Sequence, residues 1–365
     1  MARVTVIGAG IAGLTTALYA TTAGHHVVVL DRTDTLGGRA TSQTIAGVPL
    51  GYGLHLLNKK GPLAKVVKKI SRLPLVHSSP RLDRLNVVGV GPLRPRNNVR
   101  LAAEIRRALR TRDNASLAYR GATLLAGSGT PHDEKRLKAL QKGHLSLIGE
   151  GWAGVVGRMA AALDEVGVLI EPHCTVETVN KGQVSLKDGR TFESDVVVVA
   201  CGLSAAKRLL PSAEDQVLST VQPIKASTVD AVLDSKPLGN LHGLIDVNEG
   251  AYVVDAANLQ PRWPHNGAVL SALMAARENE DGEARLERLM AFLDEHATGW
   301  QRHVVHVRKQ SNITVQTKGK KPRFDAYASE GILLAGEWVE SPHALADAAA
   351  DTGRLCGQNI SAGLA

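Results

Sequence analysis

The residues that could do chemistry begin with three glycines near the N-terminus, Gly8, Gly10 and Gly13, in the pattern G-x-G-x-x-G. They lie between a β-branched run at residues 3–7 and small and apolar residues that predict a helix over 13–23. In that setting the first glycine permits a tight turn and the second lets the main chain approach a pyrophosphate. The third lets the helix pack on the strand. The pattern predicts a dinucleotide site.

An acidic residue stands where such a site needs one. Asp31 follows a second β-branched run at residues 27–30 and lies 23 residues after Gly8. A carboxylate at this strand end accepts hydrogen bonds from ribose hydroxyls and repels a 2′-phosphate. We therefore expect NAD or FAD rather than NADP. A glycine-rich turn without a ligand is the structural alternative.

A second motif narrows the choice of cofactor. Residues 36–42, Leu-Gly-Gly-Arg-Ala-Thr-Ser, resemble the L-G-G-R-x-x-S segment of the amine oxidase and phytoene desaturase superfamily of flavoproteins. The resemblance implies that Arg39 pairs with the phosphates of FAD, a task that suits a planar, permanently charged guanidinium. Residues 51–55 resemble the stretch that lines the flavin in phytoene-dehydrogenase-like members. His55 in this stretch is a catalytic candidate, and a packing role is its alternative.

The C-terminal part agrees with this resemblance. Residues 331–339 resemble a family strand whose acidic residue bonds the ribityl or phosphate region, with Glu337 in place of the commoner Asp. Residues 344–349 resemble the helix that points its N-terminus at the flavin ring, where the positive dipole end favours the anionic reduced flavin. Trp338 is a further catalytic candidate. So is Lys225, because amine oxidases often carry a lysine near flavin N5 in such a strand, although a surface role is its alternative.

The resemblance thus implies FAD and a defined set of contacts. The expected cofactor-binding residues are Gly8, Gly10, Ile11, Ala12, Gly13, Asp31, Arg32, Gly38, Arg39, Ala40, Gly53, Val176, Gly202, Gly336, Glu337, Leu345 and Ala346. The expected catalytic residues are His55, Lys225 and Trp338. No metal site is expected, because the three cysteines are widely spaced and His303 and His306 would face opposite sides of a strand.

The elements that must position these residues fit about two domains in 365 residues. We expect an α/β fold in which a discontinuous Rossmann-type FAD-binding domain comprises residues 1–58, 144–215 and 321–365. An α+β substrate domain would be inserted as residues 59–143 and 216–320. Within it the patterns predict strands over 225–234, 267–275 and 302–308 and a helix over 283–297.

Charge is concentrated in one part of the chain. Residues 59–142 contain 20 Lys and Arg against five acids, although the whole chain carries only +8. Two basic amphipathic helices, over 63–70 and 101–109, could lie on an anionic membrane and admit an apolar substrate. Ordinary surface helices are the alternative. Nucleic acid is not expected as a partner, because interleaved aromatic residues are missing.

The resemblance implies an FAD-dependent oxidoreductase that moves a hydride from a substrate C–H to flavin N5. Apolar composition and the cationic segment favour a desaturase or dehydrogenase acting on an isoprenoid- or lipid-like molecule. A flavin amine oxidase is the first alternative. The second is a cofactor-free prenyl-binding protein similar to the GDP dissociation inhibitors. We expect a cytoplasmic protein, with or without peripheral membrane contact, since no run approaches the ~20 apolar residues of a membrane span.

Overall fold

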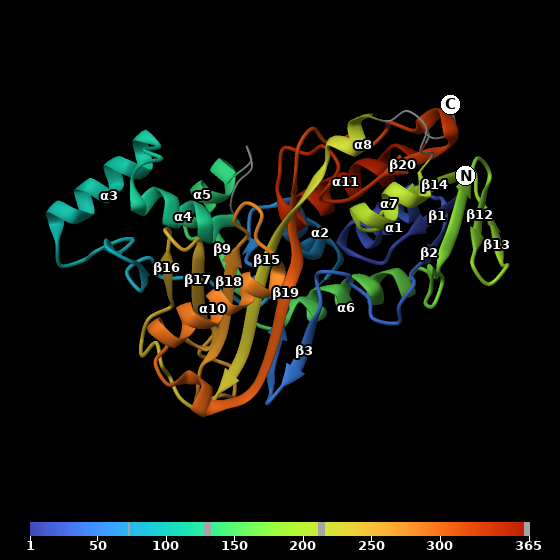
Figure 1. The fold of residues 1–365 in the computed structure, drawn as a ribbon. Helices are drawn as coiled ribbons and strands as arrows, with labels where there is room; N and C mark the ends of the chain where they lie inside the picture. Colours follow the sequence, from blue (N-terminus) through green and yellow to red (C-terminus); the bar gives the residue numbers. More distant parts are fainter. Residues whose placement is uncertain (72–73, 128–132, 211–215, 361–365) are drawn as a thin grey trace.

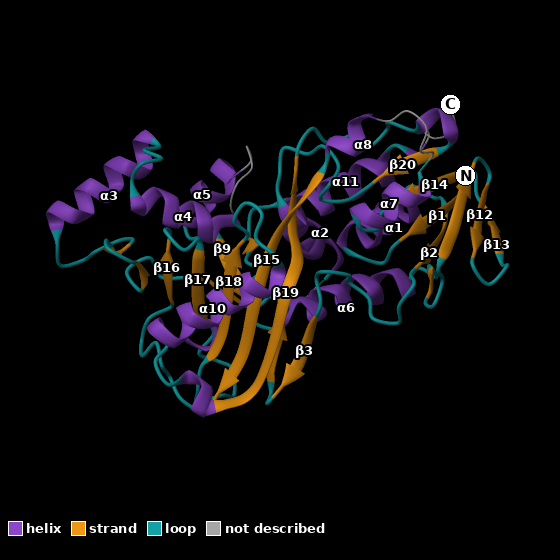
Figure 2. Cartoon of the chain, viewed as in Figure 1, coloured by secondary structure: helices purple, strands orange, loops and turns teal. Residues whose placement is uncertain are grey.

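The computed structural model describes residues 1–71, 74–127, 133–210 and 216–360 (Figure 1). Within them the chain forms two lobes, one built on a five-stranded parallel sheet and the other on a seven-stranded sheet. Helices accompany the sheets of both lobes, and the first and last described segments of the chain lie in the parallel-sheet lobe (Figure 2). The predicted α/β class with a Rossmann-type sheet is confirmed.

The parallel sheet consists of β-branched runs. In spatial order its strands are β10 (Leu169–Glu171), β2 (His26–Leu30), β1 (Arg3–Ile7), β14 (Val196–Val199) and β20 (Ile332–Leu334). Each neighbouring pair is parallel, so the carboxyl ends of all five strands meet at one edge. The four valines of β14 are all buried, as expected of a strand covered on both faces.

Four helices pack into one apolar cluster with this sheet: α1 (Ile11–Thr22), α2 (Pro62–Ile70), α6 (Gly151–Asp164) and α11 (Leu345–Gln358). Helices α1 and α11 approach closely because small residues face each other. A Cβ at Gly353 would lie 2.4 Å from the Ala12 carbonyl oxygen, and one at Gly357 would lie 2.6 Å from that of Thr16. The N-terminal and C-terminal segments are therefore held together by packing between their helices.

Helix α2 departs from our expectation. Its Leu63, Val66 and Val67 side chains are 0%, 3% and 1% exposed and share a core cluster with Met159 of α6. The helix falls in the segment expected to belong to the substrate domain, and its pattern left open whether it would lie on a membrane or be an ordinary surface helix. Because that face is buried against the parallel-sheet lobe, it has no apolar surface to offer a bilayer.

The other face of the parallel sheet carries an antiparallel three-stranded sheet and two short helices. These elements are β11 (Val176–Asn180), β12 (Gln183–Leu186), β13 (Thr191–Glu193), α7 (Leu203–Leu209) and α8 (Gln216–Thr220). Strands β12 and β13 form a hairpin around the turn at residues 187–190.

The second lobe is organised around two long strands. Its sheet order is β19 (Val304–Lys318), β15 (Gln222–Leu233), β18 (Val269–Ala275), β17 (Ala251–Asp255), β16 (Gly243–Asp246), β7 (Leu85–Val87) and β8 (Gly91–Pro92). Strand β19 was predicted over residues 302–308 but extends to Lys318. Together β15 and β19 run from the far end of this lobe to the parallel-sheet lobe (Figure 1).

Helices cover both faces of this sheet. Successive side chains of β17 point to opposite faces and pack against different helices. Ala251 and Val253 face a cluster with α10 (Gly282–His296), whereas Tyr252 and Val254 face a cluster with three other helices. Those helices are α3 (Val99–Thr111), α4 (Leu117–Gly127) and α5 (Asp133–Gln141).

Small elements fill the junction between the lobes. They are β3 (Ser42–Ile45), β4 (Val48–Gly51), β5 (Leu57–Asn58), β6 (His77–Ser78), β9 (Leu145–Ile148) and α9 (Ala256–Leu259). Strand β4 contacts β15, which brings residues 51–55 against the seven-stranded sheet. Among the described residues, no helix combines the length and the apolarity needed to cross a bilayer.

Candidate functional site

The predicted cofactor segments meet at the carboxyl edge of the parallel sheet. Gly8 follows β1, Asp31 follows β2, Gly202 comes shortly after β14, and Gly336 lies two residues after β20. These segments lie far apart in the sequence, yet parallel pairing ends their strands together. This edge is where a sheet of this type binds its ligand.

The turn between β1 and α1 has one glycine that faces open space. A Cβ at Gly8, where φ is +110°, would lie 3.0 Å from the Ala200 carbonyl oxygen. A Cβ at Gly13 would lie 1.8 Å from the Gly8 carbonyl oxygen. A Cβ at Gly10 would approach nothing closer than the Gly37 carbonyl oxygen at 3.7 Å. Protein packing therefore requires glycine at 8 and 13, whereas the space at 10 is left for something else.

Helix α1 begins beside that space with its first N–H groups uncapped. Gly10 is its N-cap, no side chain caps it, and its first turn contains no acid. Two further glycines border the same edge with room to spare. A Cβ at Gly38 would come no nearer than 3.8 Å to Gly10, and one at Gly202 would meet nothing within 4 Å. An uncapped helix N-terminus framed by glycine main chain fits the pyrophosphate of a dinucleotide.

Asp31 is fixed in place by hydrogen bonds. One carboxylate oxygen accepts the Ala9 N–H at 2.7 Å, and the other accepts the N–H and hydroxyl of Thr33, each at 3.0 Å. The Cys174 N–H donates to the Asp31 carbonyl oxygen at 2.7 Å. This bond brings the start of β11, with Val176, to the strand end that carries Asp31, where the adenosine half is expected.

Glu337 is buried, with an exposed fraction of 2%. One of its carboxylate oxygens accepts the N–H and hydroxyl of Thr317, at 2.8 and 2.9 Å, and lies 3.2 Å from the Lys321 ammonium. Sequence reasoning missed both partners, because Lys321 stands in a run of basic residues with no pattern to single it out. The C-terminal end of β19 thus holds the acid that the motif was expected to offer to the cofactor.

Arg39 makes only long contacts with the protein, among them a hydrogen bond of 3.4 Å to the Thr314 carbonyl oxygen. Its side chain is 53% exposed, and one guanidinium nitrogen lies 3.5 Å from the second carboxylate oxygen of Glu337. Arg32 is also exposed, whereas Ala40 packs against the apolar core. A half-exposed guanidinium with one distant carboxylate retains donors for a phosphate.

Side chains at the start of helix α11 make contacts with other segments of the protein, which the motif did not indicate. Its N-cap, Ala344, provides no side-chain hydrogen bond. Leu345 has a φ of +56°, and its side chain lies against Gly127. Asp347 turns towards α2 and accepts the Leu63 N–H at 3.3 Å, and burial raises its pKa to about 6. Any role of Leu345 and Ala346 in cofactor binding would therefore involve their main chain.

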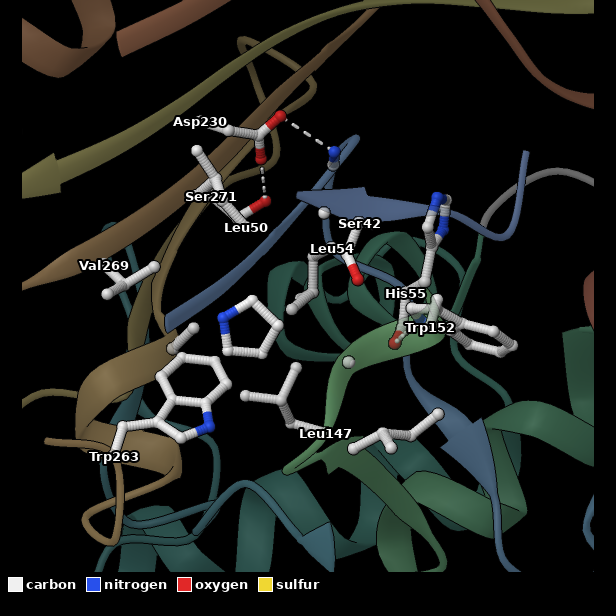
Figure 3. Close-up of a pocket in the computed structure, with 16 residues that line it drawn as sticks. Ser42, Leu50, Leu54, His55, Leu147, Trp152, Asp230, Trp263, Val269 and Ser271 are labelled. Carbon is white, nitrogen blue, oxygen red and sulfur yellow. Dashed lines mark hydrogen bonds between the residues drawn. The ribbon is translucent and has the colours of Figure 1, made fainter. Parts of the chain in front are cut away.

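His55 lies in a small pocket between β4, α6 and the seven-stranded sheet (Figure 3). The imidazole and the Trp152 ring are perpendicular, with their centroids 6.0 Å apart. The Trp152 indole N–H donates a hydrogen bond to the His55 carbonyl oxygen at 3.0 Å. Burial, and then the positive charge of Arg39, lower the pKa of His55 to about 4. The imidazole is therefore neutral at pH 7.

The pocket around His55 has a volume of about 40 Å³, which is room for a water-sized molecule. Its wall is mainly apolar, with Leu50, Leu54, Leu147, Trp152 and Trp263 among the residues in Figure 3. The polar side chains in the wall are Ser42, His55, Asp230 and Ser271.

Asp230 is the pocket residue that sequence reasoning missed. It is 1% exposed and accepts the Gly53 N–H at 2.9 Å and the Ser271 hydroxyl at 2.7 Å (Figure 3). Burial raises its pKa to about 6, although these bonds and the guanidinium of Arg308, 4.0 Å away, oppose the shift. An acid between Val229 and Ala231, inside an apolar strand, was the signal that could have found it.

Lys225 lies on the wrong face of β15 for this pocket. Thr228 and Asp230 face the segment around Gly53, while the alternate residue Ser227 bonds Arg285 of α10 at 3.0 Å. The bulges against β19 skip residues of β19, so the alternation along β15 is unbroken. Lys225 therefore shares the face of Ser227, and the structure brings Asp230 rather than Lys225 to the pocket.

Trp338 is placed in the core. It is 2% exposed, its indole N–H donates to the Cys201 carbonyl oxygen at 2.9 Å, and its ring would contact a Cβ at Gly336. This placement supports a packing role that joins the ends of β14 and β20. Its catalytic role stays a prediction.

The comparisons with known proteins agree with this geometry. A family model described as FAD dependent oxidoreductase matches residues 3–294. Among curated proteins, no sequence matches the chain.

Solved structures of similar fold cover nearly the whole chain. An oxidoreductase from Methanosarcina mazei has a TM-score of 0.75 and 17% identity, covering 97% of this chain and 99% of its own. Cyclohexylamine oxidase from Brevibacterium oxydans has 0.70 and 16%, covering 100% and 98%. A fatty acid isomerase from P. acnes, described as CLA-producing, has 0.71 and 14%, covering 97% and 98%. At these identities the likeness concerns the fold.

Proposed function

The chain belongs to the family of FAD dependent oxidoreductases, and from that premise we propose that it is a desaturase or dehydrogenase acting on an apolar, isoprenoid- or lipid-like molecule. Membership of this family means that the protein is an FAD-dependent enzyme, so the alternative of a cofactor-free prenyl-binding protein is set aside. Bound FAD supplies an electron-accepting ring that takes a hydride from a substrate C–H. The apolar substrate class is our proposal, in the manner of the phytoene-dehydrogenase-like enzymes that the sequence resembles.

The observation that supports this class is the apolar wall beside residues 51–55. Leu50, Leu54 and Leu147 form much of it, and His55 adds no charge at neutral pH because its pKa is lowered to about 4. A mainly apolar wall favours contact with a hydrocarbon part of a substrate.

The chain's own contribution would be binding and orientation. We assign the pyrophosphate to the N–H groups at the start of α1 and to Arg39, and the ribose hydroxyls to Asp31. Gly53 would hold its main chain against the cofactor because Asp230 fixes its N–H. Trp152 would keep the His55 ring in place.

The deciding experiment is anaerobic reduction of the purified holoenzyme. The absorbance of oxidised flavin is followed while polyenes, fatty compounds and amines are added, with dithionite defining full reduction. Bleaching by polyenes or fatty compounds is the expected result. Bleaching by amines alone would overturn the apolar class.

The amine oxidase alternative has one observation in its favour. The carboxylate of Asp230 shares the pocket with Trp152 and Trp263, and a carboxylate with aromatic faces is a setting that holds an ammonium ion. Asp230 already accepts two hydrogen bonds from the protein, which leaves it fewer lone pairs for an ammonium ion. We therefore keep the apolar substrate as the preferred class.

The proposed membrane surface over residues 59–142 loses one of its two amphipathic helices, because the apolar face of α2 is buried. Helix α3 retains its basic residues, so any peripheral membrane contact would depend on that helix.

A further inference from the structure

A second, larger cleft lies in the basic part of the chain, between α3, α5 and the loop before α3. Its volume is about 800 Å³, within the range of small-molecule sites. It shares no lining residue with the pocket at His55. Figure 1 shows α3, in cyan, standing apart from the seven-stranded sheet.

The inner wall of this cleft is apolar in several places. Leu93, Leu109, Tyr119 and Leu137 line it, together with Val99 at the start of α3, which is 78% exposed. Val99, Ala102 and Leu109 of helix α3 line the cleft, whereas Ile105 is buried and Leu101 packs against the core of the lobe. Such a surface has water to lose on binding a hydrocarbon chain.

The rim is strongly cationic. Six cationic side chains line the cleft, with Glu134 as the single acid: Arg94, Arg96, Arg106, Arg110, Arg112 and Lys138. Arg112 pairs with Glu134 at 2.6 Å, and Arg96 pairs with Asp83 at 2.9 Å.

Four of these cations keep their charge unneutralised. Within the described part of the chain, Arg94, Arg106, Arg110 and Lys138 have no carboxylate within 4.0 Å. Arg106 and Arg110 stand four residues apart on one helix, an arrangement in which like charges repel. A bound anion would remove that repulsion.

We propose that this cleft binds a free, single-chain amphiphilic anion, a long-chain carboxylate or alkyl phosphate. The hydrocarbon chain lies against Leu93, Leu109 and Leu137, and the head group lies between Arg106 and Arg110. A concave site suits a molecule that enters it, whereas a flat bilayer would leave the apolar floor uncovered. The site is independent of the reaction at His55 and does not rest on the apolar substrate class.

The test is calorimetric titration of the holoenzyme with dodecyl phosphate below its micelle concentration. We expect saturable binding of one molecule per chain that weakens as salt is raised. Arg110→Glu should weaken binding about tenfold or more, because it removes a charge-assisted bond and adds repulsion. Arg107→Glu makes the same change on an exposed residue of α3 outside the cleft and should leave the affinity within about twofold.

Three results would overturn the proposal. The first is a failure of the expected titration, seen either as no saturable binding of dodecyl phosphate or as an equal loss of affinity in both variants. The second is equal affinity for inorganic phosphate, which would indicate an anion site without a chain site. The third is binding to vesicles that contain phosphatidylglycerol but not to monomeric dodecyl phosphate, which would indicate a membrane surface. Circular dichroism and dithionite-reducible flavin in both variants establish that the protein remains folded.

Discussion

The carboxylate of Asp230 accepts the main-chain N–H of Gly53 at 2.9 Å, and this bond ties the middle of β15 to the segment that precedes His55. A residue of the seven-stranded sheet thereby positions the stretch expected to line the flavin. The same carboxylate accepts the Ser271 hydroxyl, so its place is fixed from two strands.

Replacing Asp230 with Asn should change the pH profile of activity. Burial raises the pKa of Asp230 to about 6, so the wild-type carboxyl group changes charge beside the pocket near that pH. We expect an inflection near pH 6 in kcat/KM that Asp230→Asn abolishes, with a loss of about tenfold at pH 7.5. Asp234→Asn, on an exposed residue just after β15, is the control and should keep the wild-type profile. An unchanged inflection in Asp230→Asn would remove Asp230 from the site.

Gly10→Ala and Gly13→Ala should fail in different ways. A methyl group at 13 would lie 1.8 Å from the Gly8 carbonyl oxygen, so this variant should lose much of its stability or not fold. A methyl group at 10 meets open space in the protein and an ordinary backbone conformation. Gly10→Ala should therefore keep the melting temperature of the apoprotein but bind FAD about tenfold or more weakly, as measured by flavin fluorescence. Normal FAD affinity in Gly10→Ala would contradict the proposed phosphate position.

Lys321→Met should destabilise the protein. It leaves the buried Glu337 without its close cation, at a cost of about 2–4 kcal/mol in the free energy of unfolding. The control Lys320→Met changes an exposed neighbour and should have little effect. Adding Glu337→Gln to Lys321→Met should recover part of the loss, as urea denaturation can measure. Additive losses would show that the two residues are not coupled.

His55→Gln should reduce the loss of stability in acid. The pKa of His55 is about 4 in the folded protein against an ordinary 6.5, so between these values only the unfolded chain binds the proton. Wild-type stability should therefore fall as pH decreases from 6.5 towards 4, by on the order of 1–3 kcal/mol from this group. Asp230, Asp255 and Asp347 have raised pKa values and act in the opposite direction.

For this reason the quantity to compare is the difference between variant and wild type. Urea midpoints of both proteins at pH 7.5 and pH 5 give that difference directly. A variant that loses as much stability as wild type on acidification would show that His55 is not buried in solution.

Lys225→Met should leave catalysis nearly unchanged. Lys225 shares the face of β15 that carries Ser227, away from Asp230. We expect kcat within about twofold of wild type, because a substitution outside the site rarely does more. A hundredfold loss would restore Lys225 as the lysine near flavin N5.

Local patterns were sufficient for the cofactor half of the fold. Strands β1 and β2 are β-branched runs that lead to Gly8 and to Asp31, and the glycine spacing defines the turn after β1. Helix α10 was also predicted closely, because its polar and apolar faces alternate at helical spacing.

Long-range partners could not be predicted in the same way. Nothing near Asp230 in the sequence points to Gly53, which lies 177 residues away, and nothing near Glu337 points to Thr317 at the end of a polar strand. Helix α2 shows the same limit. Its amphipathic pattern identified a face to be buried, but only tertiary packing decided that α6 and α11 would cover it.

The length of β15 and β19 has a mechanical consequence. Both strands belong to one sheet, and Thr317, near the C-terminal end of β19, hydrogen-bonds to Glu337 of the parallel-sheet lobe. The two lobes are therefore connected by continuous strands and by these bonds rather than by a flexible linker. A hinge motion that separates the lobes would have to break hydrogen bonds between β15 and β19 or those to Glu337. Entry of a substrate to the interior should therefore depend on rearrangement of loops and side chains, while the two lobes keep their positions relative to each other.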